Sequence, residues 1–398
     1  MKGYQFEDTQ GTFHLKKAEN ISYLYFPIAG EAGLKSSFTP NLGGDAKIDQ
    51  NTFLLEPVSA ENLVNNRNSR NFWCNVKGIG SWSLTGHSAE ELSKKFTEMQ
   101  DDSEVTAGFM WQKTTRESKK YQLRGEILSF IPVDKNVEIM LVTITNTGRM
   151  AQTVTPTAAI PLYGRSADNI RDHRHVTSLL HRIETTDTGV LVTPTLSFDE
   201  RGHQVNHMTY YCVGWSGNGE KPVDFYPTAE DFVGEGGNFE RPYAIVKNAE
   251  GVKAGTKIEG LEAVGGLHFS EITLEPEEEC SYLIFTGITE DIQEIRNLSK
   301  TYTTREKVLE ELEKTKAYWQ EKVNVAYHTG DSDFNQFMHW VSFQPILRRI
   351  YGCSFLPHHD YGKGGRGWRD LWQDCLALLI MNPDGVRQML LDNFAGVR

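Results

Sequence analysis

The chain has 398 residues, of which 39% are hydrophobic and 11% aromatic, a composition typical of a globular protein and not of a disordered one. Its 53 acidic residues outnumber its 41 basic residues and give a net charge of −12. A general attraction to nucleic acid phosphates or to an anionic membrane is therefore not expected, and the partner should be neutral or an anion held by a local basic patch.

The N-terminus and the cysteines favour a cytoplasmic protein. Residues 1–8 contain no apolar run of the kind that forms a signal peptide, and no run in the chain approaches membrane-spanning length. The five cysteines lie far apart, are odd in number and lack the CxxC spacing of zinc and redox sites. We expect reduced thiols that pack as small apolar side chains.

The first 288 residues predict a large antiparallel β-sandwich, because short apolar or alternating runs are separated by Gly, Asn, Asp and Pro. Strands are expected at Ile21–Phe26, Val137–Ile144, Val190–Val192, Met208–Val213 and Cys280–Phe285. Both faces of the run from 137 to 144 are largely apolar, which predicts a strand covered on both sides. One helical insertion is expected from Ser88 to Met99, since Ser88 and Glu91 have the spacing of a capping box.

The composition changes at Thr289. Residues 291–322 are dense in Glu, Lys, Leu and Gln, and their apolar residues have helical spacing, which predicts a solvated helical linker. Asp331-Ser332-Asp333 then fits the start of a helix that Pro345 should kink or divide. Two more helices are expected at Asp370–Met381 and Asp384–Asn393. We therefore divide the chain into a sandwich at 1–288, a linker at 289–326 and a helical domain at 327–398.

The stretch from Gly364 to Asp374 is the strongest functional signal. Its glycines allow a ligand to approach the backbone closely, and Trp368 and Trp372 offer flat apolar faces to pyranose rings. Charged hydrogen-bonding groups come from Arg366, Arg369, Asp370 and Asp374. Since Arg366, Asp370 and Asp374 are four residues apart, they should share one side of a helix, where they could either grip sugar hydroxyls or form structural ion pairs. Lys363 and Arg366, set among glycines, fit an oxyanion site.

Other polar clusters leave alternatives open. Arg165 and the run from Asp168 to His175 fit either a loop that reaches into a neighbouring site or a self-paired surface loop. The segment from Asn65 to Trp73 fits either a carbohydrate-binding loop or a turn that enters a strand. Neither His173 and His175 nor His358-His359-Asp360 has a third or fourth ligand at suitable spacing, so no metal site is predicted. No nucleophile elbow, Walker loop or dinucleotide fingerprint is present.

The order of these segments, together with the run from Arg366 to Asp374, resembles the glycoside hydrolase family that contains cellobiose and chitobiose phosphorylases, family 94. The core of the resemblance is Arg369-Asp370 followed by Gln373-Asp374, and looser matches extend to Gly43-Gly44 and to the segment from Asn65 to Trp73. The resemblance implies a multidomain β + α fold: an N-terminal antiparallel β-sandwich, a helical linker and the first helices of an (α/α)6 barrel.

The resemblance also implies an activity, inverting phosphorolysis of β-linked gluco-oligosaccharides to α-glucose 1-phosphate by a homodimer. Inorganic phosphate is then a substrate, and no cofactor is required. Arg369 and Asp370 would hold hydroxyls of the glucosyl unit at the cleaved end, beside Trp368 and Asp374, and Lys363 or Arg366 would bind phosphate. The loop from Arg171 to His175 would border the acceptor subsites, either of its own subunit or of a partner subunit.

The family's general acid belongs to a later part of the barrel, so we expect it beyond residue 398 and expect this chain to be a fragment without a catalytic residue of its own. Such a fragment should leave apolar faces of its last helices uncovered. Two alternatives remain. One is an inverting hydrolase of the glucoamylase type, which uses water and two carboxylates. The other is a non-catalytic sandwich that binds carbohydrate.

Overall fold

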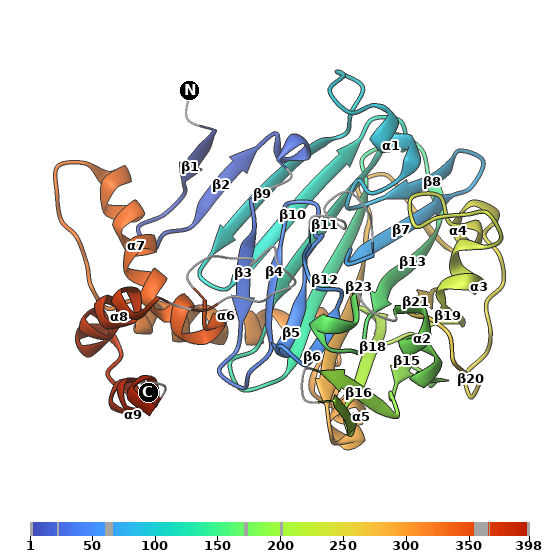
Figure 1. Ribbon diagram of the computed structural model, residues 1–398. Helices are drawn as coiled ribbons and strands as arrows, with labels where there is room; N and C mark the ends of the chain where they lie inside the picture. The colour runs from blue at the N-terminus through green and yellow to red at the C-terminus, as the bar shows by residue number, and fades with distance from the viewer. Residues whose placement is uncertain are drawn as a thin grey trace.

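A computed structural model describes residues 3–21, 24–59, 67–170, 174–199, 202–353, 365 and 367–395. Strands fill the first three quarters of the chain and helices the last quarter (Figure 1). The predicted order of an antiparallel β-sandwich followed by helices is therefore confirmed. Within the described residues, no helix is both long enough and apolar enough to span a membrane.

The largest sheet has eleven strands, and each strand is antiparallel to its neighbours. In spatial order they are β1 (Tyr4–Phe6), β2 (Phe13–Lys16), β9 (Asp102–Gly108), β10 (Trp111–Ser118), β11 (Leu123–Phe130), β12 (Val137–Asn146), β23 (Glu279–Thr289), β18 (Thr209–Ser216), β15 (Gly189–Val192), β14 (Arg182–Thr185) and β20 (Lys257–Glu259).

Three smaller sheets complete the β part. One contains β19 (Asp224–Thr228), β21 (Ala263–His268), β13 (Gln152–Leu162), β7 (Asn71–Val76) and β8 (Gly80–Ser83), with β22 (Ile272–Leu274) paired to β13. The second contains β3 (Phe26–Ala29), β4 (Lys35–Phe38), β5 (Ala46–Asp49) and β6 (Thr52–Leu55). The third is the hairpin of β16 (Leu196–Asp199) and β17 (Gly202–Val205).

Strand β12 shows why the sheets stack. Met140, Val142 and Ile144 point into the main core between the sheets, whereas Ile139 and Leu141 point to the opposite face. Burial of both faces confirms the prediction made from the apolar run at 137–144. The expected strands at 190–192, 208–213 and 280–285 are present as parts of β15, β18 and β23. The strand expected at 21–26 is wrong, because Ile21, Leu24 and Tyr25 lie outside any strand and β3 begins only at Phe26.

Short helices decorate the sandwich: α1 (Ala89–Ser93), α2 (Arg174–Thr177), α3 (Ala229–Val233), α4 (Tyr243–Lys247) and the 3-10 turns Ala18–Asn20, Ala167–Ile170 and Ser178–Leu180. Ser88 caps α1 as predicted, accepting a hydrogen bond from the Glu91 amide at 3.1 Å. The predicted length of this helix is wrong. Leu92, Phe96 and Met99 are exposed, so no packed face extends the helix beyond its first turns, and Phe96 turns the chain with a φ of 66°.

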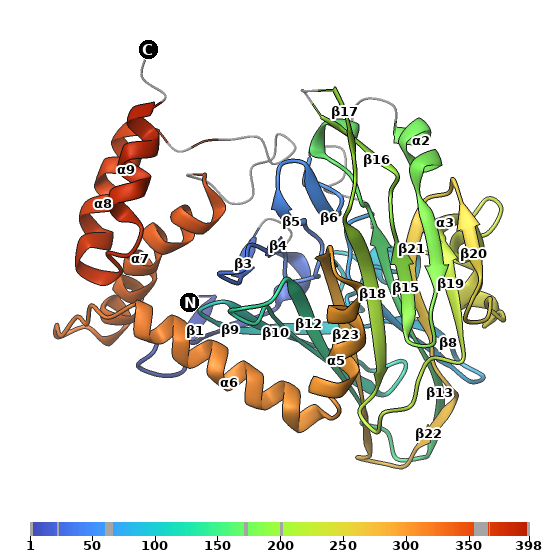
Figure 2. The same cartoon turned by 90° about the horizontal axis from the view of Figure 1, so that it is seen from below.

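The residues after β23 form two helices, α5 (Ile292–Thr301) and α6 (Arg305–Lys322). The composition had indicated a solvated linker, but these helices are not solvated on all sides. Ile295, Leu298, Val308 and Leu312 pack against the outer face of the large sheet, and Figure 2 shows α6 running along that face. These helices are what covers the second face of β12.

Three further helices form the end of the chain: α7 (Ser332–Tyr351), α8 (Trp368–Met381) and α9 (Val386–Ala395). Asp331 caps α7 as predicted, with its Oδ1 accepting from the Phe334 amide at 3.1 Å. Pro345 does not divide α7, because the buried residues Phe343, Ile346 and Leu347 on either side of it hold one continuous helix. That these helices begin an (α/α)6 barrel, and the domain limits 1–288, 289–326 and 327–398, stay predictions.

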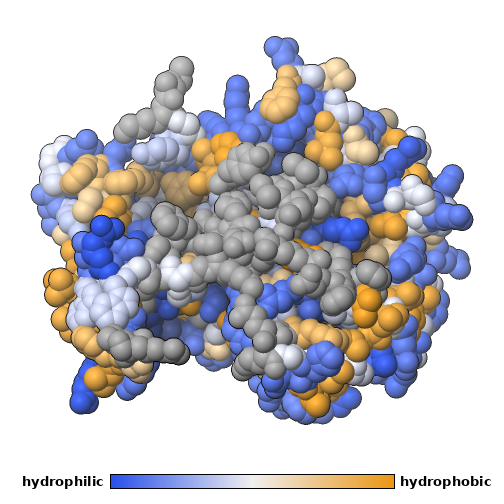
Figure 3. Space-filling view, viewed as in Figure 1, coloured by the Kyte–Doolittle hydropathy of each residue, from blue (hydrophilic) through white to orange (hydrophobic). Residues whose placement is uncertain are grey.

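The outer sides of α8 and α9 carry exposed apolar residues, as expected for helices with an uncovered face. Leu376, Leu379 and Ile380 of α8 are 68%, 56% and 73% exposed, and Leu391 of α9 is 50% exposed. Figure 3 shows apolar surface at the end of the molecule where Figure 1 places these helices. All five cysteines lie in the described part of the chain and none forms a disulfide.

Candidate functional site

The predicted sugar motif lies at the start of α8. Gly367 is the N-cap, and a Cβ atom at this position would stand 3.1 Å from Asp370 Oδ2, so glycine leaves room for that carboxylate. Asp370 lies in the first turn, where the positive end of the helix dipole favours an acidic side chain. Arg369 Nη2 donates to Asp370 Oδ1 at 3.3 Å, and the Arg369 side chain is 84% exposed. The structure therefore places this pair together at the surface, where both groups can reach a ligand.

Aromatic surface adjoins this pair. Trp368 and Trp372 are 49% and 38% exposed and lie one helical turn apart. The ring of Phe394 in α9 meets both edge to face, with centroids 6.0 and 5.4 Å away. These contacts fix the indoles while leaving part of each exposed, which is the arrangement that stacking of a sugar ring requires.

Asp374 has a different environment. Its side chain is 2% exposed and accepts hydrogen bonds from Arg348 of α7, with Nε at 2.9 and 3.0 Å and Nη2 at 2.6 Å. Such a bidentate pair between a buried carboxylate and a guanidinium fixes the packing of α7 against α8. The spacing had left open whether Asp374 grips sugar hydroxyls or forms a structural ion pair. The structure shows the ion pair, and the sugar contact of Asp374 stays a prediction.

Several residues singled out in the sequence lie outside the described residues. Among them are both candidate phosphate ligands, Lys363 and Arg366, and the runs 65–66, 171–173 and 358–360. Within the described part of the chain, no group of three or more His, Cys, Asp or Glu side chains is arranged to hold a metal ion.

A buried network, which the sequence analysis missed, joins the two looser segments of the resemblance. Arg70 ion-pairs with Glu138 of β12 and donates to the backbone oxygens of Gly44 and Asp45 at 3.0 and 3.2 Å. Ser36 Oγ donates to Glu138 Oε2 at 2.6 Å. Both charged side chains are 0% exposed. The available signal was the single carboxylate on a face of β12 whose next three members, Met140, Val142 and Ile144, are apolar.

Tyr351, the last residue of α7, connects this network to the helices. Its hydroxyl lies 2.9 and 2.5 Å from the backbone oxygens of Ile28 and Ser36, which share its single proton. Burial raises the pKa of Tyr351 well above its usual value. The end of α7 is therefore anchored on the sheet of β3 to β6, beside the Arg70–Glu138 pair.

Comparison with known proteins decides the family. The domain described as "Glycosyl hydrolase 94, supersandwich domain" matches residues 55–305, more than half of the chain. The chain belongs to glycoside hydrolase family 94. The match runs from the end of β6 through the sandwich and α5 to the first residue of α6, and so covers most of the β-sheet structure.

Individual relatives of this family 94 chain are distant. Cyclic β-(1,2)-glucan synthase NdvB from Rhizobium meliloti (strain 1021) is 26% identical over 185 residues, which are 46% of this chain and 6% of that protein. A bacterial glucoamylase complexed with acarbose has a TM-score of 0.46 and 10% identity over 97% of this chain and 49% of its own. A putative aldose 1-epimerase from Escherichia coli K12 has a TM-score of 0.36 and 10% identity over 67% of this chain and 99% of its own. The chain thus spans half or less of the glucan synthase and of the glucoamylase.

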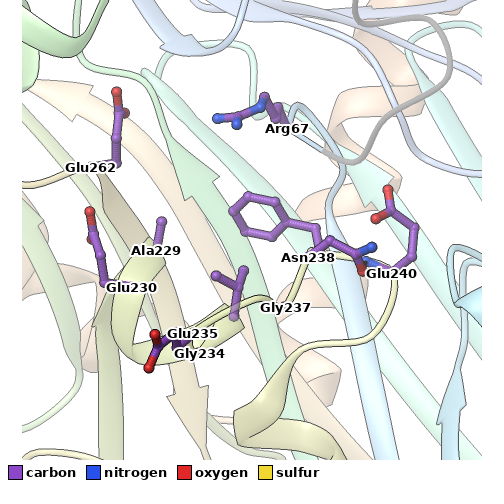
Figure 4. Close-up of a pocket in the computed structure, with 11 residues that line it drawn as sticks. Arg67, Ala229, Glu230, Gly234, Glu235, Gly237, Asn238, Glu240 and Glu262 are labelled. Atoms are coloured by element: carbon purple, nitrogen blue, oxygen red, sulfur yellow. Dashed lines mark hydrogen bonds between the residues drawn. The ribbon is translucent and has the colours of Figure 1, made fainter.

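The supersandwich of this family 94 chain also contains a cavity of about 580 Å3 beside α3. Its walls come from Arg67, from the stretch Ala229–Glu240 and from Glu262 just before β21, as Figure 4 shows. Glu262 is ion-paired at 2.9 Å with Arg165, a residue of the loop that the sequence analysis had singled out. Arg165 is 3% exposed and does not line the cavity, so the pair joins a carboxylate of the cavity wall to a buried guanidinium.

Proposed function

We propose that the full-length protein containing this chain is an inverting glycoside phosphorylase. It converts β-linked gluco-oligosaccharides and inorganic phosphate into α-glucose 1-phosphate and a shortened sugar. Membership of family 94, through the match over residues 55–305, is the observation that carries the proposal. The name of the relative, a β-(1,2)-glucan synthase, supports a β-linked glucan as the substrate class.

The start of α8 supplies the sugar contacts in this proposal. The Asp370 carboxylate accepts hydrogen bonds from hydroxyls of the terminal glucosyl unit, and Arg369 donates to them. Trp368, exposed beside the pair, presents an apolar face to the pyranose ring. Lys363 or Arg366 binds the phosphate. Asp374, beyond its predicted sugar contact, also supports this site, because its ion pair with Arg348 holds α8 against α7.

In the reaction, a phosphate oxygen forms a bond to the anomeric carbon from the face opposite the leaving group, and the glycosidic carbon–oxygen bond breaks. A carboxylic acid donates a proton to the leaving oxygen. We assign this acid to none of the residues of this chain. The working enzyme is proposed to be a homodimer, and sedimentation of the full-length protein measures that state directly.

Phosphate dependence tests the proposal. The full-length enzyme is incubated with β-1,2-, β-1,3- and β-1,4-linked gluco-oligosaccharides, with and without inorganic phosphate, and α-glucose 1-phosphate and free glucose are measured. We expect the sugar phosphate to form from at least one linkage, and only when phosphate is present. Glucose release at the same rate without phosphate would reject the proposal and favour an inverting hydrolase.

Matched variants locate the site. Arg369→Ala and Asp370→Asn should each lower kcat/KM for phosphorolysis, since each removes a charged hydrogen-bonding group. Arg149→Ala, an exposed arginine in the turn between β12 and β13, is the control and should leave kcat/KM unchanged. If Arg369→Ala behaves like the control, the sugar site does not lie at the start of α8.

A further inference from the structure

We propose that the cavity beside α3 is a second saccharide-binding site, which holds a β-linked gluco-oligosaccharide on the supersandwich. Figures 1 and 2 place α3 and α8 at opposite ends of the molecule, so a sugar held here does not contact Arg369 or Asp370. The choice of a β-linked glucan rests on the proposed function, whereas the class of ligand follows from the cavity itself.

One wall of the cavity is a loop with tight, hydrogen-bonded turns. Thr228 caps α3, its Oγ1 accepting from the Asp231 amide at 3.1 Å, and Gly234 ends the helix with a φ of 71°. A Cβ atom on Gly237 would stand 1.9 Å from the Val233 carbonyl oxygen, so only glycine allows this tight return. Asn238 Oδ1 then accepts from the amides of Glu240 and Arg241 at 3.1 and 2.8 Å.

The loop is also anchored on a core. Phe232, Ala244 and Ile245 form a buried cluster with Trp73 of β7 and other residues of the sheet, and Phe239 packs partly against that cluster. The rings of Phe232 and Phe239 lie 6.0 Å apart. Because backbone turns and a hydrophobic core both define the loop, the cavity is pre-formed, as ligand sites usually are. Its volume of about 580 Å3 lies within the range of roughly 300 to 1,000 Å3 that is typical of such sites.

The charges of the wall exclude an anion. Four glutamates, at positions 230, 235, 240 and 262, line the cavity with one arginine, Arg67. Glu262 is already paired with Arg165, so three glutamates face the single charge of Arg67. Figure 4 shows the Arg67 guanidinium directed toward the side that carries Glu230 and Glu262. An anionic sugar or free phosphate would meet a net negative wall. A metal ion is also disfavoured, since the carboxylates in the described part of the chain form no group of three suited to coordinating one.

A neutral polyol fits the same wall. Separated carboxylates, an amide and a guanidinium can each serve a different hydroxyl, and the half-buried ring of Phe239 gives an apolar face for the carbon–hydrogen bonds of a pyranose. A small adjoining recess of about 20 Å3 shares Arg67, Phe239 and Glu262 with the cavity and has no room for a sugar unit. The cavity itself, at about 580 Å3, has room for more than one sugar unit, which favours an oligosaccharide over a single sugar.

Binding without turnover tests this site. The 398-residue chain with Arg369→Ala and Asp370→Ala, which removes the predicted contacts at α8, is titrated calorimetrically with β-1,2-, β-1,3- and β-1,4-linked gluco-oligosaccharides. We expect at least one of them to bind. Adding Phe239→Ala should weaken that binding by about three- to tenfold, the effect of losing an aromatic contact. Phe96→Ala, which removes an aromatic ring that is 81% exposed elsewhere on the sandwich, is the matched control and should change nothing.

A second variant guards against misfolding of Phe239→Ala. Glu230→Ala combined with Glu235→Ala alters two exposed cavity residues and should also weaken binding without a change in thermal unfolding. The proposal is overturned if none of the oligosaccharides binds in the Arg369→Ala, Asp370→Ala background, or if binding survives the Glu230→Ala, Glu235→Ala change undiminished. Failure of the phosphorolysis assay would not alter this titration, so the two proposals fail separately.

Discussion

Glu138→Ala should be among the most destabilising single changes in the sandwich. Glu138 and Arg70 are both 0% exposed, and the carboxylate accepts two hydrogen bonds from Arg70 and one from Ser36. Its removal leaves the buried guanidinium with two backbone oxygens and no counter-charge. Breaking a buried ion pair in this way costs about 3–5 kcal/mol. A loss of that size is a large part of the roughly 5–15 kcal/mol by which domains are usually stable.

Equilibrium unfolding in urea measures this loss, and a surface pair provides the control. Glu126 of β11 pairs with Lys113 at 3.3 Å but is 32% exposed, so Glu126→Ala should cost less than about 1 kcal/mol. The double variant Arg70→Met, Glu138→Leu should be more stable than Glu138→Ala, because it buries no unpaired charge. The inference is wrong if Glu138→Ala lowers the free energy of unfolding no more than Glu126→Ala does. It is also wrong if the double variant is the least stable of the set.

Three further results are expected. Gly44→Ala should destabilise the chain by more than about 2 kcal/mol in the same urea assay, since its Cβ would stand 1.9 Å from the Ser37 oxygen at a φ of 141°. Gly330→Ala, with open space around it and no positive φ, is the control. Burial, and then the nearby Arg165, lower the pKa of His181 to about 3 from 6.5. Stability should therefore fall by up to about 1.4 kcal/mol per pH unit as pH drops from 6.5 to 4, and His181→Gln should flatten that slope in unfolding measured across pH. Arg369→Ala should shift the unfolding free energy by less than about 0.5 kcal/mol, while sugar affinity, measured by calorimetry, falls roughly tenfold or more; a large loss of stability would give Arg369 a structural role.

The sequence predicted those elements that local pattern determines. Strand β12 was recognisable because both faces of one short run are apolar, and the start of α7 because Asp331 precedes a helical pattern. The helix after Ser88 was over-extended, since spacing alone does not reveal that Leu92 and Phe96 meet no partner surface. Likewise, the composition of residues 291–322 does not reveal that α5 and α6 pack against a sheet that is distant in the sequence.

In the candidate site, too, local patterns were predictable and long-range contacts were not. The motif at the start of α8 was found because its residues are adjacent in the chain. The partner of Asp374 is Arg348, 26 positions away on another helix, and no local pattern connects them. The cavity beside α3 was missed for the same reason, since Arg67, Phe239 and Glu262 come from three separate stretches that only the folded sheet brings together.

Helix α6 restricts how the two parts of the chain can move relative to each other. Val308 near its start is buried in the cluster on the outer sheet face, whereas Trp319 near its end is buried among α7 and α8. They are eleven positions apart, which is about 16 Å along one continuous helix. If the terminal helices moved relative to the β part, α6 would have to bend or one of its ends would have to leave its packing site. The orientation of the α8 motif is therefore set by a helix that is held at both ends.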